Sequence, residues 1–133
     1  MKKKVTSSDK LKRLIKLLEE KKAQDIVILD TRKQSDIWNN FIICSAMSSI
    51  HIKALKNYIL TEMKKYDYLP VHSEGEFDSN WVVIDYDDVL LHIFDEKTRK
   101  YYSLEKLWGE SETKVIKKQK KVAKNERTKK NKN

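Results

Sequence analysis

Apolar residues recur every three or four positions in two segments of the chain, which is the spacing of one face of an α-helix. In the first segment they are Leu11, Leu14, Ile15 and Leu18. In the second segment they are Ile52, Leu55, Ile59, Met63 and Tyr66. Ser8 or Asp9 can cap the first helix, which we expect to end near Lys22. Ser48 or Ser49 can cap the second helix.

Short apolar runs rich in β-branched side chains predict strands around these helices. Four such runs are residues 25–31, 41–46, 81–84 and 89–94. A weaker strand signal lies near Val71, and residues 99–102 are expected to be extended or irregular. The segment SLEKLWGE at residues 103–110 predicts a short helix. The order of helix, strands, helix, strands and helix predicts an α/β fold, in which helices pack on a mixed sheet.

Charge divides the chain into a basic start, an acidic middle and a basic end, within a net charge of +9. Residues 112–133 hold 10 Lys and Arg against 2 Glu, and residues 1–22 hold 9 basic against 3 acidic residues. The stretch between them therefore holds 10 basic and 15 acidic residues. An acidic body suits a basic protein partner better than nucleic-acid phosphates, which the two basic ends are free to contact.

The basic end has almost no large apolar side chains, so burial cannot offset the entropy of ordering it. We therefore expect one folded domain over residues 1–111 and a disordered tail over residues 112–133. The single cysteine, Cys44, excludes an internal disulfide and is typical of the reducing cytosol. No apolar run approaches the ~20 residues of a membrane helix. The basic N-terminus is not followed by an uninterrupted apolar segment, so we expect no signal peptide. These features predict a cytoplasmic protein without a membrane segment.

Three carboxylates, Asp85, Asp87 and Asp88, stand between the last two predicted strands. Alternate residues of a strand point the same way, so Asp85 and Asp87 could share a Mg²⁺ ion, as paired carboxylates do in nucleotidyltransferases. The segment SAMSS at residues 45–49 offers the strand-to-helix junction on which such an enzyme binds phosphate. That segment has no glycine, however, and aspartate is favoured in turns because it hydrogen-bonds nearby backbone. We therefore favour a hairpin turn, with a metal-dependent nucleotidyltransferase as the alternative.

Two residues with reactive side chains lie inside apolar runs. Cys44 is interpreted as a small core residue, and His92 as a strand histidine that satisfies a hydrogen bond inside the fold. No Cys or His stands at ligand spacing from them, so no zinc site is expected. Trp81, at the start of a strand, has two open interpretations: a core residue at the edge of the sheet, or an anchor in a protein interface.

Four segments of the chain form a combined pattern that is more specific than any one of them. They are NNFIICSAMSSIHIKA at residues 39–54, the Glu74-Gly75 pair, WVVIDYDDVLLHIF at residues 81–94 and RKYYSLEKLW at residues 99–108. In order and spacing this pattern resembles the ribosomal silencing factors, also called the Iojap family, over residues 11–108. The sequence departs from the family pattern at Asn39 and Asn40, where the family has Asp-Tyr, and at Ala46, where it has Gly. The lysine-rich tail is not part of the pattern.

The resemblance implies a fold like that of the nucleotidyltransferases without their catalytic site, and it implies no cofactor or metal. It implies a translational repressor that binds the large ribosomal subunit through its fourteenth protein. The bound factor would keep the small subunit from joining and slow translation when nutrients are scarce. A role in late maturation of the large subunit is also implied. The basic tail is a candidate for weak contact with ribosomal RNA, and a homodimer away from the ribosome is compatible with this role.

Carried over residue by residue, the resemblance assigns the partner contact to Trp81 and Val82. Weaker candidates near the same surface are Asp85, Tyr102, Leu104 and Leu107. Trp81 would fill an apolar pocket of the ribosomal protein, while Glu74 and Asp85 would face its basic rim and speed the encounter. The expected function is therefore binding and steric exclusion without catalysis, and a general RNA-binding module run by the basic ends is a further alternative.

Overall fold

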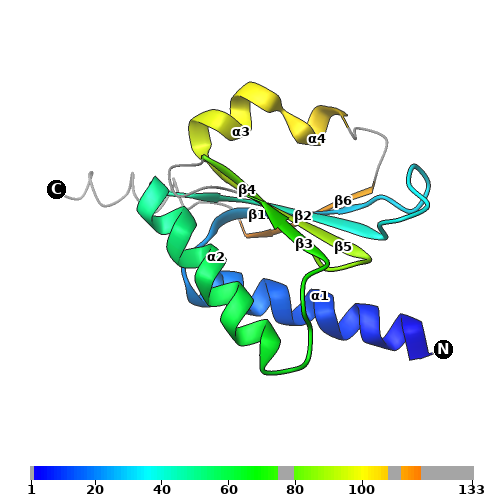
Figure 1. Ribbon diagram of the computed structural model, residues 1–133. Helices are drawn as coiled ribbons and strands as arrows, with labels where there is room; N and C mark the ends of the chain where they lie inside the picture. The colour runs from blue at the N-terminus through cyan, green and yellow to red at the C-terminus, as the bar shows by residue number, and fades with distance from the viewer. Residues whose placement is uncertain (1, 75–79, 108–111, 118–133) are drawn as a thin grey trace, which may run out of the picture.

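The computed structural model describes residues 2–74, 80–107 and 112–117, and places side chains for residues 9–74 and 80–106. Within these residues, six strands form one sheet in the order β3-β4-β5-β2-β1-β6 (Figure 1). They are β1 Gln24–Asp30, β2 Asn40–Ala46, β3 His72–Glu74, β4 Trp81–Asp85, β5 Val89–Asp95 and β6 Glu112–Lys117. β2 and β5 run parallel and every other neighbouring pair runs antiparallel, so the sheet is mixed.

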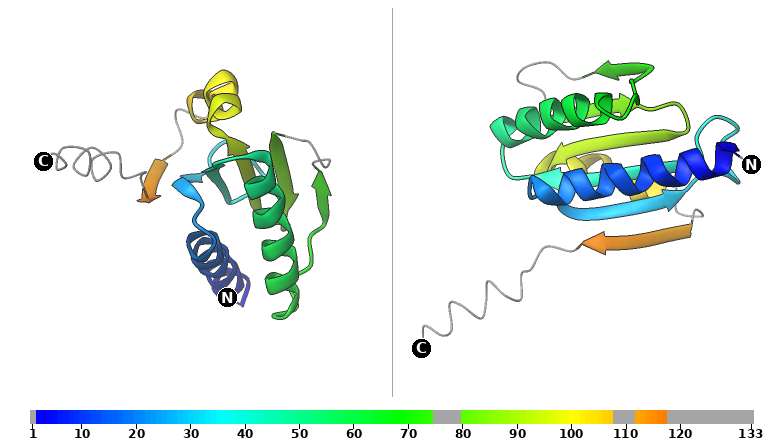
Figure 2. Two further views of the ribbon diagram at one scale, coloured as in Figure 1. Left: turned by 90° about the vertical axis from the view of Figure 1, so that its left-hand side faces the viewer. Right: turned by 90° about the horizontal axis from the view of Figure 1, so that it is seen from below.

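Helices cover both faces of this sheet, which confirms the predicted α/β fold. Two long helices, α1 Lys2–Glu20 and α2 Ser49–Lys64, lie on one face and contact each other. Two short helices, α3 Glu96–Tyr102 and α4 Leu104–Leu107, lie on the opposite face. The left view of Figure 2 shows the sheet standing between these two layers. None of the helices described combines the length and the apolar composition needed to cross a membrane.

Side chains of the central strands alternate between two apolar cores. On β5, Leu91 and Ile93 belong to the core under α1 and α2, whereas Leu90 and Phe94 belong to the core under α3 and α4. On β2 the first core receives Ile42 and Cys44, and the second receives Phe41 and Ile43. Burial on both faces explains why these strands appear in the sequence as continuous apolar runs.

The boundaries of α2 follow from its local sequence. The Ser48 side chain accepts a hydrogen bond from the His51 backbone N–H at 3.1 Å, which confirms the predicted cap. Tyr66, predicted as the last apolar position of the helix, lies beyond its end and is exposed. Its ring instead lies 3.6 Å from the guanidinium carbon of Arg13 on α1, a cation–π contact.

Residues 99–102, expected to be extended or irregular, are helical and end α3, so that expectation is wrong. The Asp95 carboxylate caps the helix by accepting the Thr98 N–H at 2.8 Å, and Ser103 ends it in the left-handed conformation at φ 46°. Arg99 then fixes α3 to the sheet, because its Nη1 donates to the Asp25 carbonyl and the Ser45 hydroxyl, both at 2.8 Å. The predicted short helix that follows is α4, and residues 108–110 of that prediction lie outside the described part of the chain.

The tail expected to be disordered begins with a strand. β6 pairs antiparallel with β1, from Asp30 opposite Glu112 to Ile26 opposite Lys117. Without β6, β1 would be an edge strand with unpaired backbone groups, and the sequence of β6 contains three β-branched residues that favour a strand. The expectation of disorder is therefore wrong for Glu112–Lys117, because backbone pairing compensates for the missing apolar burial. Residues 118–133 lie outside the described part.

Removing β6 should destabilise the domain, whereas removing only the residues after it should not. A chain that ends at Lys117 keeps the β1–β6 pairing, and a chain that ends at Ser111 leaves the β1 edge open. Each backbone hydrogen bond is worth roughly 0.5–1.5 kcal/mol net, so we expect the shorter chain to lose about 2 kcal/mol or more of unfolding free energy in a urea titration. Equal stability of the two chains would contradict a stabilising role for β6.

Candidate partner-binding surface around Trp81

Trp81 begins β4 and lies half-buried on the α3–α4 face of the sheet. Its indole stacks on Phe94, with ring centroids 4.8 Å apart and an interplanar angle of 27°, and Tyr102 of α3 also lies 4.8 Å away. The indole Nε1–H donates a hydrogen bond to Nδ1 of His92 at 3.2 Å. The β4–β5 register sets Trp81 opposite Phe94, and His92 stands two residues before Phe94, so the three rings share one face. Trp81 is thus packed against the core and still reaches the surface.

His92 is only 5 % exposed and lies on the α3–α4 side of the sheet, where its ring contacts Phe41 and Phe94 of that core. Burial lowers the pKa of His92 from 6.5 to about 4, so the ring is neutral at neutral pH. An indole N–H can only donate, so Nδ1 of His92 carries the lone pair and the ring proton sits on Nε2. That Nε2–H is buried and has no hydrogen-bond partner in the described structure, which costs about 1–3 kcal/mol. The prediction that His92 satisfies a hydrogen bond inside the fold is therefore confirmed at Nδ1, while Nε2 has no partner.

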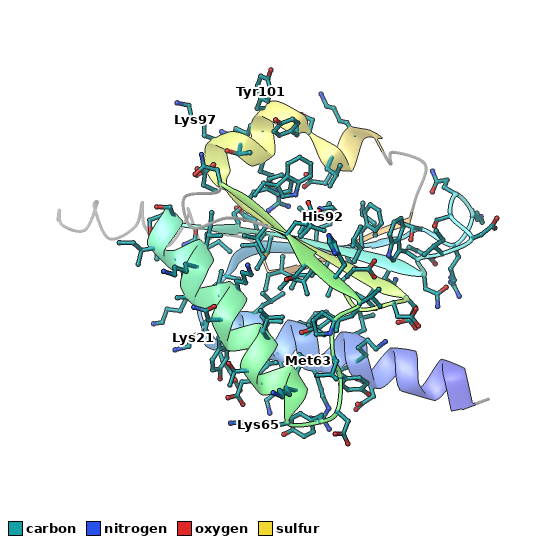
Figure 3. The ribbon with its side chains drawn as sticks, viewed as in Figure 1. Lys21, Met63, Lys65, His92, Lys97 and Tyr101 are labelled. Atoms are coloured by element: carbon teal, nitrogen blue, oxygen red, sulfur yellow. The ribbon has the colours of Figure 1, made fainter. Side chains whose placement is uncertain are left out.

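A hollow of about 420 Å³ lies beside Trp81, between the start of β4 and α3. Its lining consists of Asn80, Trp81, Lys97, Thr98, Tyr101 and Tyr102. Tyr101 is 80 % exposed and Tyr102 is 47 % exposed. Lys97 and Tyr101 project from α3 away from the sheet in Figure 3. The candidates predicted from the sequence include Tyr102 but neither Lys97 nor Tyr101, although two adjacent tyrosines in a charged segment are a signal that could have added Tyr101.

The other predicted contact residues lie in different places. Val82 is 2 % exposed and belongs to the core under α1 and α2, so its side chain is not available to a partner, contrary to the prediction. Leu104, the first residue of α4, is buried in the same core against which Trp81 packs. Glu74 is exposed on β3, where its carboxylate lies 2.8 Å from the His72 ring. The side chain of Leu107 lies outside the described residues.

The acidic segment between β4 and β5 is a hairpin turn, which confirms the favoured interpretation. Oδ1 of Asp85 accepts the Asp87 backbone N–H at 2.9 Å, and Asp87 has the positive φ of 79° that aspartate tolerates in turns. Asp88 pairs instead with Lys10 of α1 at 2.8 Å. In the described ranges no three His, Cys, Asp or Glu side chains are grouped to hold a metal ion. The geometry therefore gives no support to the shared Mg²⁺ ion of the nucleotidyltransferase alternative.

Two other chemically notable side chains have structural roles. Cys44 is fully buried in β2, and burial raises the pKa of its thiol to about 12, as suits a core residue. Arg99 lines a second hollow of about 420 Å³ under α3 and α4. Its guanidinium is already engaged there, because Nη2 donates to the Glu105 carboxylate at 2.7 Å in addition to the bonds of Nη1.

The buried neutral His92 should make the fold less stable in mild acid. Its pKa is about 4 when folded and 6.5 when exposed, so the unfolded chain binds one more proton between these values. The stabilisation is therefore complete above pH 6.5 and is lost as the pH falls toward 4, by about 3 kcal/mol. Urea titrations across this range should show a steeper loss of stability for the unmodified chain than for His92→Phe, and parallel curves would contradict the assignment.

Comparisons with known proteins extend these observations. Residues 4–133 match the model of a family described as "Ribosomal silencing factor during starvation". This match includes the tail, which the sequence motifs alone did not include. Ribosomal silencing factor RsfS from Haemophilus influenzae is 37 % identical over 96 residues, which cover 72 % of this chain and 94 % of the relative. The mouse protein named Mitochondrial assembly of ribosomal large subunit protein 1 is 30 % identical over 101 residues, covering 71 % of this chain and 43 % of that protein.

Solved structures share the same fold. A crystal structure of a protein from Chromobacterium violaceum has a TM-score of 0.74 and 34 % sequence identity, covering 77 % of this chain and 85 % of that one. A crystal structure from Bacillus halodurans has a TM-score of 0.72 and 28 % identity, covering 82 % of this chain and 99 % of that one. The family match over nearly the whole chain, the identities and the shared fold lead to one conclusion, which the sequence motifs had predicted: this chain belongs to the family of ribosomal silencing factors.

Proposed function

We propose that this chain represses translation by binding the large ribosomal subunit, through its fourteenth protein, where the small subunit must join. The proposal rests on the position of Trp81 at the surface. This half-buried tryptophan donates a hydrogen bond to His92 inside the fold, and it lines the same hollow as the exposed ring of Tyr101. Membership in the ribosomal silencing factors supports the ribosome as the target. The function requires no catalytic residue, and its effect is expected when nutrients are scarce.

Apolar and charged residues have different roles in this contact. Trp81 and Tyr102 stack on each other and supply the large aromatic area that is typical of binding hot spots. Glu74 and Asp85 lie on the neighbouring strands β3 and β4. Asp85 is about 13 Å along β4 from Trp81, and this separation suits a residue at the rim of an interface that has Trp81 near its centre. Acidic rim residues attract a basic partner and raise the rate of encounter more than the final affinity. Leu104 belongs to the core against which Trp81 packs and so supports the aromatic cluster. The Val82 side chain lies in the other core and takes no direct part in the contact with the partner.

Steric exclusion follows from mass action alone. A factor that binds only the free large subunit removes it from the pairing equilibrium, just as a ligand of one state stabilises that state. At a free concentration 100 times the dissociation constant, pairing is weakened by about 2.7 kcal/mol, or about 100-fold. The mechanism therefore needs a good fit and a sufficient amount of the factor, and it makes and breaks no covalent bond.

Trp81→Ala should weaken binding to large subunits by about 2 kcal/mol or more, which corresponds to about 30-fold, because it removes the anchor side chain. Co-sedimentation with purified large subunits measures the affinity, and circular dichroism checks the fold. Tyr66→Ala is a matched control, since Tyr66 is an exposed aromatic residue beside α1 on the other side of the sheet, and its affinity should equal that of the unmodified chain. If Trp81→Ala binds as well as the control, the anchor lies elsewhere.

The basic tail should add salt-dependent affinity through contacts with ribosomal RNA. Residues 118–133 hold 8 Lys and Arg against 1 Glu, and each phosphate contact adds about 0.7–0.9 to the slope of log affinity against log salt. The chain that ends at Lys117 keeps β6 and should show a slope lower by about 2 or more, with binding retained. If the unmodified chain and the chain that ends at Lys117 show the same slope, residues 118–133 make no such contacts.

A further inference from the structure

His92 differs from the other buried polar residues. Among the described residues the buried polar side chains are Lys10, Thr31, Ser45, His92 and Arg99. Four of them form hydrogen bonds or ion pairs through their polar ends. Within this set His92 is the exception, because it has a buried nitrogen, Nε2, without a partner; the buried hydroxyl of Tyr86 is the other such atom among the described residues. A buried donor with no acceptor weakens a fold, so the presence of a histidine here requires an explanation.

The surroundings of His92 would suit a phenylalanine at least as well. The rings of Phe41 and Phe94 lie 5.0 and 6.1 Å from the imidazole, and Phe94 is nearly parallel to it at 10°. The low pKa of His92 leaves the ring uncharged at neutral pH, so no ion pair explains it. What an imidazole supplies and a benzene ring cannot is the lone pair on Nδ1, which accepts the indole N–H of Trp81 at 3.2 Å.

This hydrogen bond sets the orientation of the Trp81 indole. Phe94 and Tyr102 pack on the indole at interplanar angles of 27° and 43°, and such stacking fixes the plane of a ring. A half turn about the Cβ–Cγ bond would preserve that plane but would carry Nε1 to the opposite side. The bond to His92 distinguishes these two orientations, because it can form only when Nε1 lies on the side of the imidazole. With Nε1 turned inward, the part of the indole that meets a partner is hydrocarbon.

We infer that His92 is a positioning residue for partner binding, which holds the polar edge of Trp81 inward and presents a hydrocarbon surface to the partner. The partner pocket that fits this surface is apolar and contains no hydrogen-bond acceptor positioned for the indole N–H. The consequence for affinity rests on the proposed function, whereas the orientation of Trp81 is a property of the free protein. Pre-organising an anchor in this way lowers the entropy that is lost on binding.

Two substitutions of His92 should have opposite effects on stability and on affinity. His92→Phe removes the unpartnered Nε2–H but also takes the acceptor away from the Trp81 N–H, so we expect stability in urea close to that of the unmodified chain but affinity for large subunits about 5–10-fold lower. His92→Asn carries an oxygen near the position of Nδ1, so we expect lower stability, from the lost volume, but affinity within about twofold of the unmodified chain. A purely structural histidine would make affinity follow stability in both variants.

The indole N–H of Trp81 provides a direct readout in the free protein. Its nuclear magnetic resonance signal can be assigned with Trp81→Phe, since the chain has 3 tryptophans. Exchange of this proton with water should be about tenfold faster in His92→Phe and nearly unchanged in His92→Asn. Phe41→Leu, which loosens the same aromatic cluster and leaves the hydrogen bond intact, should lower stability without changing exchange or affinity.

Equal exchange rates in His92→Phe and the unmodified chain would overturn the inference. The inference would also be overturned if the order of the variants by affinity for large subunits were the same as their order by stability in urea. If His92→Phe does not fold, His92→Leu tests the same loss of the acceptor with a smaller side chain. An unmodified chain that fails to bind large subunits would overturn the proposed function alone, because the exchange measurement needs no partner.

Discussion

Burial of the central strands on both faces is the constraint on which the rest of this structure depends. β2 and β5 lie side by side in the middle of the sheet, and their residues alternate between the core under α1 and α2 and the core under α3 and α4. A shift of one residue in either strand would exchange the two sets of side chains, so the register is strongly specified. The β4–β5 register then places Trp81 beside His92 and Phe94 on the face covered by the short helices. The candidate binding surface is therefore a product of the core.

The short helices leave this face suited to recognition. α3 is fixed by the Asp95 cap at its start and by Arg99 on the sheet, so Tyr101 and Tyr102 are carried on a rigid element next to Trp81. On the opposite face, α1 and α2 cover the sheet. The hairpin turn also has a structural role: Asp88 ties β5 to Lys10 of α1, and Asp85 stabilises the turn itself. Three carboxylates that suggest a metal site in the sequence thus serve to hold the fold.

The sequence predicted the elements whose signal is periodic. The four strands β1, β2, β4 and β5 and both long helices were predicted because burial imposes a regular spacing on their residues, and the cap at Ser48 was predicted from its residue type. α3 was missed because its stability comes from a cap and from bonds of Arg99 to distant residues, and β6 was missed because it depends on pairing with β1. Val82 was assigned to the same surface as Trp81, although neighbouring residues of a strand point to opposite faces, a rule that was available from the sequence. The hydrogen bond between Trp81 and His92 could not be predicted, since it depends on the register of two strands.

In the proposed function, a small folded protein prevents two ribosomal subunits from joining because it occupies one of them. Light scattering from purified subunits, mixed with increasing amounts of this protein, measures that step directly. We expect that pairing falls with dose and is restored by excess large subunits, and that Trp81→Ala is far less effective at equal concentration. If pairing stays unchanged at a saturating dose of the protein, with its binding to large subunits verified in the same sample, steric exclusion is not how the protein acts.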